Sequence, residues 1–331
     1  MEYRNHGANP TKLYKSNGIA LPKRIIDFST NTNVIKKRFI LNINKYISKY
    51  PDDENIKIKN LLKTKHNINM NQIIVGNGVN EILYLLINHY HDKTFGIIDP
   101  DYSEYQIALK NLNVKHKIFN SIKEVKNIDI LIFSNPNNPT GSYIENYKDL
   151  SHIKDVLFVI DESYIDFTFK DRPKSYKNMI ILKSLTKIYN LAGIRIGYAY
   201  GDEEIINSLN QQKPTWSVNS LAEHLACKYL KDKKFLKKTE SHYKKEKKYI
   251  EHMLNINNIK YKNSFCNFYL IPTKDDLSLM KYLLIKGLVV RHTRNYLNLN
   301  GKYIRVSVKK HKENKQLIKG LKEFKDENLF I

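Results

Sequence analysis

Short runs of apolar residues recur between about residue 55 and residue 200, and each ends in a polar residue or a turn. They occupy 72–75, 95–98, 128–133, 156–160 and 179–182. Runs of this length without polar alternation are typical of strands buried on both faces, as in a parallel sheet covered by helices. Helical apolar spacing, as at 81–86, lies between them. This part of the chain is therefore predicted to form an α/β fold with a mostly parallel sheet.

The pattern changes after a long, charged helix predicted at about 228–254. Strand-like segments at 265–271, 288–291 and 303–308 then alternate with helices near 275–286 and 311–325, which indicates a smaller α+β unit. Residues 1–36 are polar, rich in Asn and without clear periodicity, so we expect an arm or loop. We therefore predict a large domain over 37–230 and a small domain formed by 231–331 with the N-terminal arm 1–36.

The formal net charge of +23 raises the question of nucleic-acid binding. Lysine is spread along the whole chain, and its densest stretch, 228–248, alternates with apolar residues at helical spacing, as on a solvated helix face. No zinc-finger, RNA-recognition or basic-zipper pattern is present. We expect no specific nucleic-acid partner, although so basic a surface should bind polyanions non-specifically at low salt.

The sequence has no run of 18 or more apolar residues, and its first residues lack the apolar core of a signal peptide. Cys227 and Cys266 are too few and too far apart for a disulfide framework or a metal cluster. These features predict a cytoplasmic protein with two reduced thiols, no membrane anchor and no metal site.

One lysine has a favourable position for covalent chemistry. Lys187 ends the sequence Ser-Leu-Thr-Lys after the apolar run at 179–182, and Arg195 follows it after a turn that contains glycine. A lysine amine can form a Schiff base with an aldehyde, and an arginine can bind a phosphate. Together the two residues indicate pyridoxal 5′-phosphate (PLP), which carries both groups.

Arginine is rare in this lysine-rich chain. There are eight: Arg4, Arg24, Arg38, Arg172, Arg195, Arg291, Arg294 and Arg305. The planar guanidinium suits sites where an anion is bound bidentately. Arg195, Arg291 and Arg305 lie in or beside strand-like apolar runs, where a buried anionic partner is plausible.

Asp161 directly follows the apolar run at 156–160. A carboxylate at the end of a buried strand needs a cationic partner, or its pKa must rise. The protonated pyridine nitrogen of PLP would be such a partner, and the pair would make the ring an electron sink. An ordinary helix cap is the alternative. Tyr164, three residues later, could donate to the phenolate oxygen of the ring.

Three further polar segments follow predicted strands, where the ligands of open α/β sheets collect. The segment 134–141, Ser-Asn-Pro-Asn-Asn-Pro-Thr-Gly, is a turn cluster in which Asn138 could donate to the same phenolate oxygen. The glycines in 76–78 join a strand to a helix, and free N–H groups at the start of that helix favour a phosphate. Tyr102 could stack on the pyridine ring or be a core tyrosine.

Taken together, these motifs resemble the aspartate-aminotransferase fold, fold type I of the PLP-dependent enzymes. The branch is that of histidinol-phosphate aminotransferase, and threonine-phosphate decarboxylase of cobalamin synthesis is more similar still. The second likeness depends on 5–9 (Asn-His-Gly-Ala-Asn), 27–33 (Asp-Phe-Ser-Thr-Asn-Thr-Asn), 184–187 and 303–308 (Tyr-Ile-Arg-Val-Ser-Val). The resemblance covers residues 5 to about 325 and implies a mostly parallel seven-stranded sheet covered by helices, a small α+β domain and a homodimer.

The resemblance also implies roles around the cofactor. Lys187 would form the Schiff base, and Asp161 would contact the pyridine nitrogen. Asn138 and Tyr164 would contact the phenolate oxygen, with Tyr102 stacked on the ring. The cofactor phosphate would be held by Gly78, Val79, Asn80, Ser184 and Arg195, and by Tyr50 of the other subunit.

For the substrate, the resemblance implies that Arg305 binds a carboxylate, while Arg291, His6 and Asn31 surround a phosphate. Two segments depart from the family pattern. Val79 stands where the family often has a hydroxyl or an Asp, so only its backbone can contact the cofactor phosphate. Positions 34 and 35 carry Val and Ile where the decarboxylases usually have Pro and Gly, so the preference between threonine and serine phosphate can differ.

Two reactions fit these motifs. The N-terminal segments favour decarboxylation of an L-amino acid O-phosphate, threonine or serine phosphate, with Lys187 or a nearby group returning a proton to the α-carbon. The alternative is an aminotransferase acting on histidinol phosphate or a small amino-alcohol phosphate, with glutamate as partner. A basic nucleic-acid-binding protein without catalysis is a third hypothesis, against which the intact Lys187, Asp161, Asn138 and Arg195 argue. The pathway, cobalamin synthesis or another, stays open.

Overall fold

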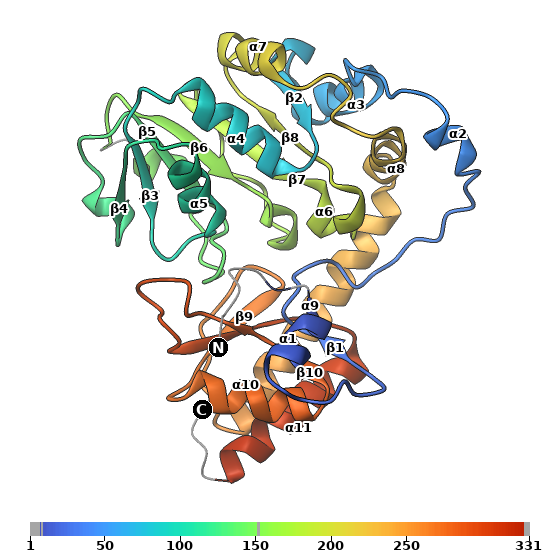
Figure 1. The fold of residues 1–331 in the computed structure, drawn as a ribbon, viewed down its shortest axis with the longest axis vertical. Coiled ribbons are helices and arrows are strands. Elements are labelled where there is room, and N and C mark those ends of the chain that lie inside the picture. Colours follow the sequence, from blue (N-terminus) through green and yellow to red (C-terminus); the bar gives the residue numbers. More distant parts are fainter. Residues whose placement is uncertain (1–6, 8, 151–152, 328–331) are drawn as a thin grey trace.

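Figure 1 shows the chain in two parts, with a large sheet and its helices above a smaller group of strands and helices. The computed structural model describes residue 7, residues 9–150 and residues 153–327. Helix α9 (Lys233–Ile256) leads from the upper part to the lower part. No helix of the described chain has the length and apolar character needed to cross a membrane.

The large part is built on a seven-stranded sheet. From edge to edge its strands are β2 (Ile73–Gly76), β8 (Gly197–Tyr200), β7 (Met179–Ser184), β6 (Leu157–Asp161), β5 (Ile130–Ser134), β3 (Phe95–Ile98) and β4 (His116–Phe119). Strand β8 is antiparallel to both of its neighbours, and all other neighbouring strands are parallel. The predicted α/β fold with a mostly parallel seven-stranded sheet is therefore confirmed.

Helices cover both faces of this sheet because successive side chains of each strand are apolar and point to opposite faces. On one face, Ile74 and its neighbours pack against α4 (Val79–His89), α5 (Glu104–Asn111) and α7 (Glu203–Gln212). On the other face, Val75 belongs to the cluster that includes α3 (Ile56–His66) and α8 (Ser220–Leu230). The central strands are thus buried on both sides, and their carboxyl ends open toward the small part.

The small part contains a three-stranded antiparallel sheet and a short parallel pair. The sheet has the order β11 (Arg291–His292), β12 (Tyr303–Ser307) and β9 (Phe268–Pro272), and the pair joins β1 (Ile26–Asp27) to β10 (Leu288–Val289). Helices α10 (Asp276–Ile285) and α11 (His311–Asp326) lie where the sequence predicted them. The pairing of β1 with β10 places the N-terminal segment beside the C-terminal third of the chain.

The N-terminal segment is more ordered than the expected arm or loop. Residues Pro10–Ser16 form helix α1, which begins with proline and is capped by Asn9, whose Oδ1 accepts from Lys12 N at 3.2 Å. Tyr14 is buried and donates from its hydroxyl to Leu284 O at 2.7 Å. The sequence prediction was wrong here because a helix of two turns is too short to show clear periodicity.

Two other elements differ from their prediction. The charged helix expected at about 228–254 is interrupted, because Asp232 accepts from Phe235 N at 3.0 Å and caps a new helix, α9. The single strand expected at 288–291 forms two strands that pair with different partners, β1 and β12. The domain boundaries, 37–230 and 1–36 with 231–331, stay a prediction.

Candidate active site

A cavity of about 400 Å³ lies where the large sheet meets the small part. Its floor is formed by the last residues of three adjacent strands, Ser134 of β5, Asp161 of β6 and Ser184 of β7. The small part contributes Arg291 and Arg305 from β11 and β12. The cavity therefore lies at the carboxyl ends of parallel strands, where the sequence predicted a ligand site.

The cavity brings together most of the residues singled out from the sequence. Its lining includes Asn31, Gly78, Val79, Asn80, Tyr102, Asn138, Asp161, Tyr164, Ser184, Lys187, Arg195, Arg291 and Arg305. Tyr50 lies outside it, 78% exposed, with its ring stacked on Trp216 at a centroid distance of 4.4 Å. His6 lies outside the described residues. The roles predicted for these side chains stay predictions.

Asp161 is buried at the end of β6, where its two oxygens are held by different donors. Oδ1 accepts from Ser163 N at 2.8 Å, and Oδ2 accepts from the Tyr105 hydroxyl at 2.9 Å. Burial raises the pKa of Asp161, while the bonds from Ser163 and Tyr105 and the charge of Lys187 oppose the shift. A buried carboxylate of this kind is stabilised by a cation placed in the cavity.

Lys187 lies in the short helix α6 (Leu185–Ile188), directly after β7. Its Nζ lies 6.0 Å from the centre of the Tyr164 ring. Burial lowers the pKa of Lys187 to about 8, with further lowering by the charges of Arg305 and Arg195 and opposition from Asp161. The amine can therefore lose its proton near neutral pH, as a nucleophile or a proton carrier must.

The start of α4 forms a site for an anion. Gly78 caps this helix in the left-handed region, at φ 81°, and as a glycine it has no side chain to cap the first N–H groups of the helix. A Cβ at Gly78 would lie 2.9 Å from Arg195 Nη2, so the absence of a side chain leaves room for this guanidinium. Ser184 and Thr186 add hydroxyl groups 2.7 Å apart on the same wall. This arrangement suits a phosphate.

Arg291 and Arg305 are directly opposite in the register of β11 and β12, and both are buried. Arg305 donates from Nη1 to Asn138 Oδ1 and from Nη2 to Ser29 O at 3.1 Å, while its buried Nε has no hydrogen-bond partner in the described chain. Arg291 donates from Nη2 to Asn295 Oδ1 at 2.9 Å. Burial lowers the pKa of Arg291 to about 10, and Arg305 lowers it further while Tyr296 opposes the shift. Two guanidinium groups this close are stabilised by bound anions.

Several residues of the site were missed in the sequence. Tyr105 lies three residues after Tyr102, in α5, and donates to Asp161, and its place beside Tyr102 in the sequence could have been noticed. Asp101 is buried and accepts from Ser134 N at 2.8 Å and Tyr102 N at 2.7 Å, which links the ends of β3 and β5. No local signal indicates this link, because it depends on which strands are neighbours.

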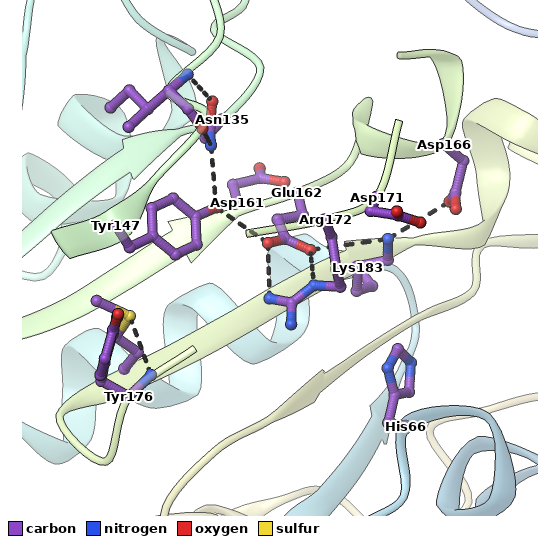
Figure 2. A network of polar contacts seen from close by, with 12 residues as sticks. His66, Asn135, Tyr147, Asp161, Glu162, Asp166, Asp171, Arg172, Tyr176 and Lys183 are labelled. Atoms are coloured by element: carbon purple, nitrogen blue, oxygen red, sulfur yellow. Dashed lines mark hydrogen bonds and ion pairs between the residues drawn. The ribbon is translucent and has the colours of Figure 1, made fainter. Parts of the chain in front are cut away.

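A buried ionic cluster lies directly behind Asp161 (Figure 2). Glu162 accepts from Arg172 Nε at 3.0 Å and Nη2 at 2.8 Å, and from the Tyr147 hydroxyl at 3.0 Å. Lys183 Nζ lies 3.8 Å from Glu162 and 3.5 Å from Asp166. The cluster lines no part of the cavity, and it holds the end of β6 in place.

Comparisons with known proteins agree with this geometry. The family model described as aminotransferase class I and II matches residues 25–321. A histidinol-phosphate aminotransferase of Campylobacter hominis is 32% identical over 90% of this chain and 90% of its own length, and several further relatives carry the same name. Among solved structures, L-threonine-O-3-phosphate decarboxylase from Porphyromonas gingivalis has a TM-score of 0.83 at 23% identity, covering 91% of this chain and 100% of that chain. Histidinol-phosphate aminotransferase from Sinorhizobium meliloti, in complex with PLP, has a TM-score of 0.83 at 18% identity, covering 97% and 95%.

The residues of the cavity fit PLP, on which enzymes of the matched family depend. The uncapped start of α4 with Arg195 suits its phosphate, and Asp161 suits its ring nitrogen. Lys187, with an amine whose pKa lies near neutral, suits its aldehyde. The cavity thus offers one partner for each reactive group of the cofactor.

Proposed function

This chain belongs to the class I and II aminotransferase family of PLP-dependent enzymes, and from that premise we propose that it decarboxylates an L-amino acid O-phosphate. The substrate is L-threonine phosphate or L-serine phosphate, and the product is the corresponding amino-alcohol phosphate. The carboxylate leaves as CO2, and a proton takes its place on the α-carbon.

The pair of buried arginines carries this proposal. Arg291 and Arg305 face the same cavity as Lys187 from neighbouring strand positions. A phospho-amino acid has one anion for each of them, its carboxylate and its phosphate. Histidinol phosphate has a phosphate but no carboxylate, so it offers no carboxylate to Arg305, whose buried Nε has no hydrogen-bond partner in the described chain.

PLP, when bound, supplies an aldehyde that takes up the substrate amine and a ring that accepts the electron pair of the broken bond. Asp161 would hold a proton at the ring nitrogen, and the start of α4 with Arg195 would bind the cofactor phosphate. Tyr102 and Tyr164 line the cavity at positions suited to the ring and its phenolate oxygen.

Arg305 would orient the substrate carboxylate. Asn138 and Ser29 hold two of its nitrogens, so the guanidinium has a fixed direction, and its free Nε remains to donate. Once CO2 has left, Lys187 Nζ would deliver a proton to the α-carbon, for which a pKa of about 8 is suitable near neutral pH.

Transamination is the second candidate, because the relatives named above are histidinol-phosphate aminotransferases. Glutamate, the amino donor of such a reaction, also carries two anions. The same arginine pair could therefore bind the substrates of a transamination, in which the Cα–H bond is broken instead.

We also propose that the enzyme is a homodimer in which Tyr50 reaches the cofactor phosphate of the partner. Tyr50 lies outside the cavity of its own chain, in a segment that includes α2 (Asn44–Ile47) and runs along the outside of the molecule (Figure 1). This segment also exposes Ile40, Ile43 and Ile47. A second subunit would cover these apolar side chains.

The test is CO2 release from PLP-loaded protein given L-threonine phosphate or L-serine phosphate without a keto acid. Equal amounts of CO2 and amino-alcohol phosphate support the decarboxylase, and the faster substrate identifies the preference. Conversion of the cofactor to its pyridoxamine form by glutamate or histidinol phosphate, with no CO2, would replace it by the aminotransferase. Lys187→Ala should abolish either reaction, whereas Lys110→Ala, an exposed lysine on α5, should not.

A further inference from the structure

A loop of the small part reaches across to the large sheet and contacts the end of β3. The loop joins β11 to β12. Asp99 Oδ2 accepts from Asn298 N at 2.7 Å, and Asp99 Oδ1 accepts from Leu297 N at 3.3 Å. The Asn298 amide donates to Asp99 O at 2.9 Å and to Asn120 Oδ1 at 3.0 Å. We call these four bonds the Asp99–Asn298 clasp.

The same loop carries two residues of the candidate active site. Asn295 Oδ1 accepts from Arg291 Nη2 at 2.9 Å, three residues before the clasp. Tyr296, two residues before it, is buried and lines the cavity. At the other end, Arg294 donates to the Asp276 carboxylate from Nε at 2.9 and 3.0 Å and from Nη2 at 2.6 Å. The loop is thus held to its own part at Arg294 and to the large sheet at Asn298.

We propose that Asp99 and Asn298 are positioning residues that hold this loop across the cavity, so that Arg291 and Tyr296 enclose the phosphate end of the substrate. The proposal rests on the proposed function, because it takes the anion at Arg291 to be the substrate phosphate. The clasp joins the two parts of the molecule directly, so while it is formed it holds the phosphate site of the small part close to Lys187 in the large part.

The position of the clasp suits a contact that opens and closes. Asn298 is exposed and Leu297 is 70% exposed, so water can replace these bonds at a modest free-energy cost. A carboxylate that accepts two neighbouring backbone N–H groups nevertheless forms charge-assisted bonds, which are stronger than neutral ones. The loop can therefore release to admit substrate and close again over it.

The experiment compares ligands that differ only in the phosphate. Dissociation constants of PLP-loaded wild type, Asp99→Ala and Asn298→Ala are measured for O-phospho-L-threonine and for L-threonine, from the first change in cofactor absorbance after rapid mixing, before turnover. Inorganic phosphate serves as a probe of the phosphate site without the amino acid, by calorimetry. Leu297→Ala is the matched control, because it trims an exposed side chain of the same loop and keeps the backbone donors.

We expect Asp99→Ala, which removes the charge-assisted bonds, to weaken binding of O-phospho-L-threonine and inorganic phosphate on the order of ten-fold. Asn298→Ala keeps the backbone donors and loses only the two neutral bonds of its amide, so it should weaken the same binding by a smaller factor. Binding of L-threonine should change less than about two-fold, and Leu297→Ala should match wild type. The proposal would be overturned if the variants bound O-phospho-L-threonine and L-threonine equally more weakly than wild type, or if neither affinity changed. A wild type without preference for the phosphorylated ligand would overturn it as well.

These binding data separate the clasp from the proposed function. If wild type binds O-phospho-L-threonine but releases no CO2, the decarboxylase is refuted. The clasp is then still tested by comparing how the variants bind O-phospho-L-threonine and L-threonine. The two variants also protect against misfolding, since Asn298→Ala changes only an exposed side chain and Asp99→Ala removes only the carboxylate that accepts from the backbone N–H groups of Leu297 and Asn298.

Discussion

Replacing Glu162 by Gln should destabilise the protein strongly, because it removes the charge from the centre of the buried ionic cluster. The Glu162 side chain has no exposed surface, and it accepts from Arg172 at 2.8 and 3.0 Å and from Tyr147 at 3.0 Å. Gln keeps the shape, but its NH2 group faces donors of Arg172. Arg172 and the buried Lys183 would lose their shared anion, and Asp166, 3.5 Å from Lys183, would remain.

Removing one partner of a buried ion pair costs about 3–5 kcal/mol. In a chain of this size each kcal/mol lowers the melting temperature by about 2 °C, so the melting temperature (Tm) of Glu162→Gln should fall by about 6–10 °C. Calorimetry of PLP-loaded protein measures this directly. A fall within the error of the measurement would show that the cluster is not a stabilising contact and would refute the reasoning.

An exposed ion pair provides the matched control. Lys286 and Glu323 are 2.7 Å apart, close to the 2.8 Å of Arg172 and Glu162, but both side chains are more than a third exposed. Solvent screens such pairs, so Glu323→Gln should leave the Tm unchanged within error. Equal shifts in the two variants would mean that burial does not decide the strength of these contacts.

Three further changes test the site itself. Arg305→Lys should raise KM for a carboxylate-bearing substrate by about ten-fold or more, because a lysine cannot make the forked contacts of a guanidinium; steady-state kinetics would contradict this if only kcat fell. Tyr105→Phe removes a hydrogen bond that lowers the pKa of Asp161, so this pKa should rise further. A spectroscopic pH titration of the bound cofactor would show the rise as a changed protonation profile of the ring, and an unchanged profile argues against the contact. Burial lowers the pKa of Lys187 to about 8, whereas an unfolded lysine titrates near 10.4. Between about pH 8 and 10.4 the unfolded chain therefore binds more protons than the folded chain, so the free energy of unfolding rises with pH across that window. In cofactor-free protein, Lys187→Met should therefore raise the Tm at pH 7 and lose this advantage toward pH 10, and a pH-independent difference would refute the assignment.

The central strands could be predicted from the sequence because each is a continuous apolar run buried on both faces. Two strands of the same sheet were missed for different reasons. Strand β4, His116–Phe119, lies at an edge with a single neighbour, and it begins with the polar pair His116 and Lys117, so it shows no continuous apolar run. Strand β8 reads Gly-Tyr-Ala-Tyr, and it is buried by its place between β2 and β7, a context that local spacing does not reveal.

The contacts of the candidate site also divide into those that local sequence patterns predict and those that they do not. Asp161 ends a strand of the large sheet, and Lys187 and Asn138 follow two others. Parallel strands bring their carboxyl ends to one edge, so the proximity of these residues follows from local patterns. The clasp could not be found this way, since Asp99 and Asn298 are 199 residues apart and meet only because the small part folds back over the sheet. Contacts between distant segments depend on the whole topology, which a single sequence does not display.

One short segment of the chain links the two halves of the candidate site. Ser29 O accepts from Arg305 Nη2 at 3.1 Å, and Asn33 N donates to Lys187 O at 2.9 Å. Three residues lie between these anchors, so the chain makes four steps of at most about 3.6 Å each, and Ser29 and Asn33 lie within about 14 Å of one another whatever the two parts of the molecule do. Asn31, between the anchors, lines the cavity and donates to the Tyr164 hydroxyl at 3.4 Å. A change of length between Ser29 and Asn33 would therefore alter the distance from Arg305 to Lys187, the two residues to which we assign the substrate carboxylate and the proton transfer.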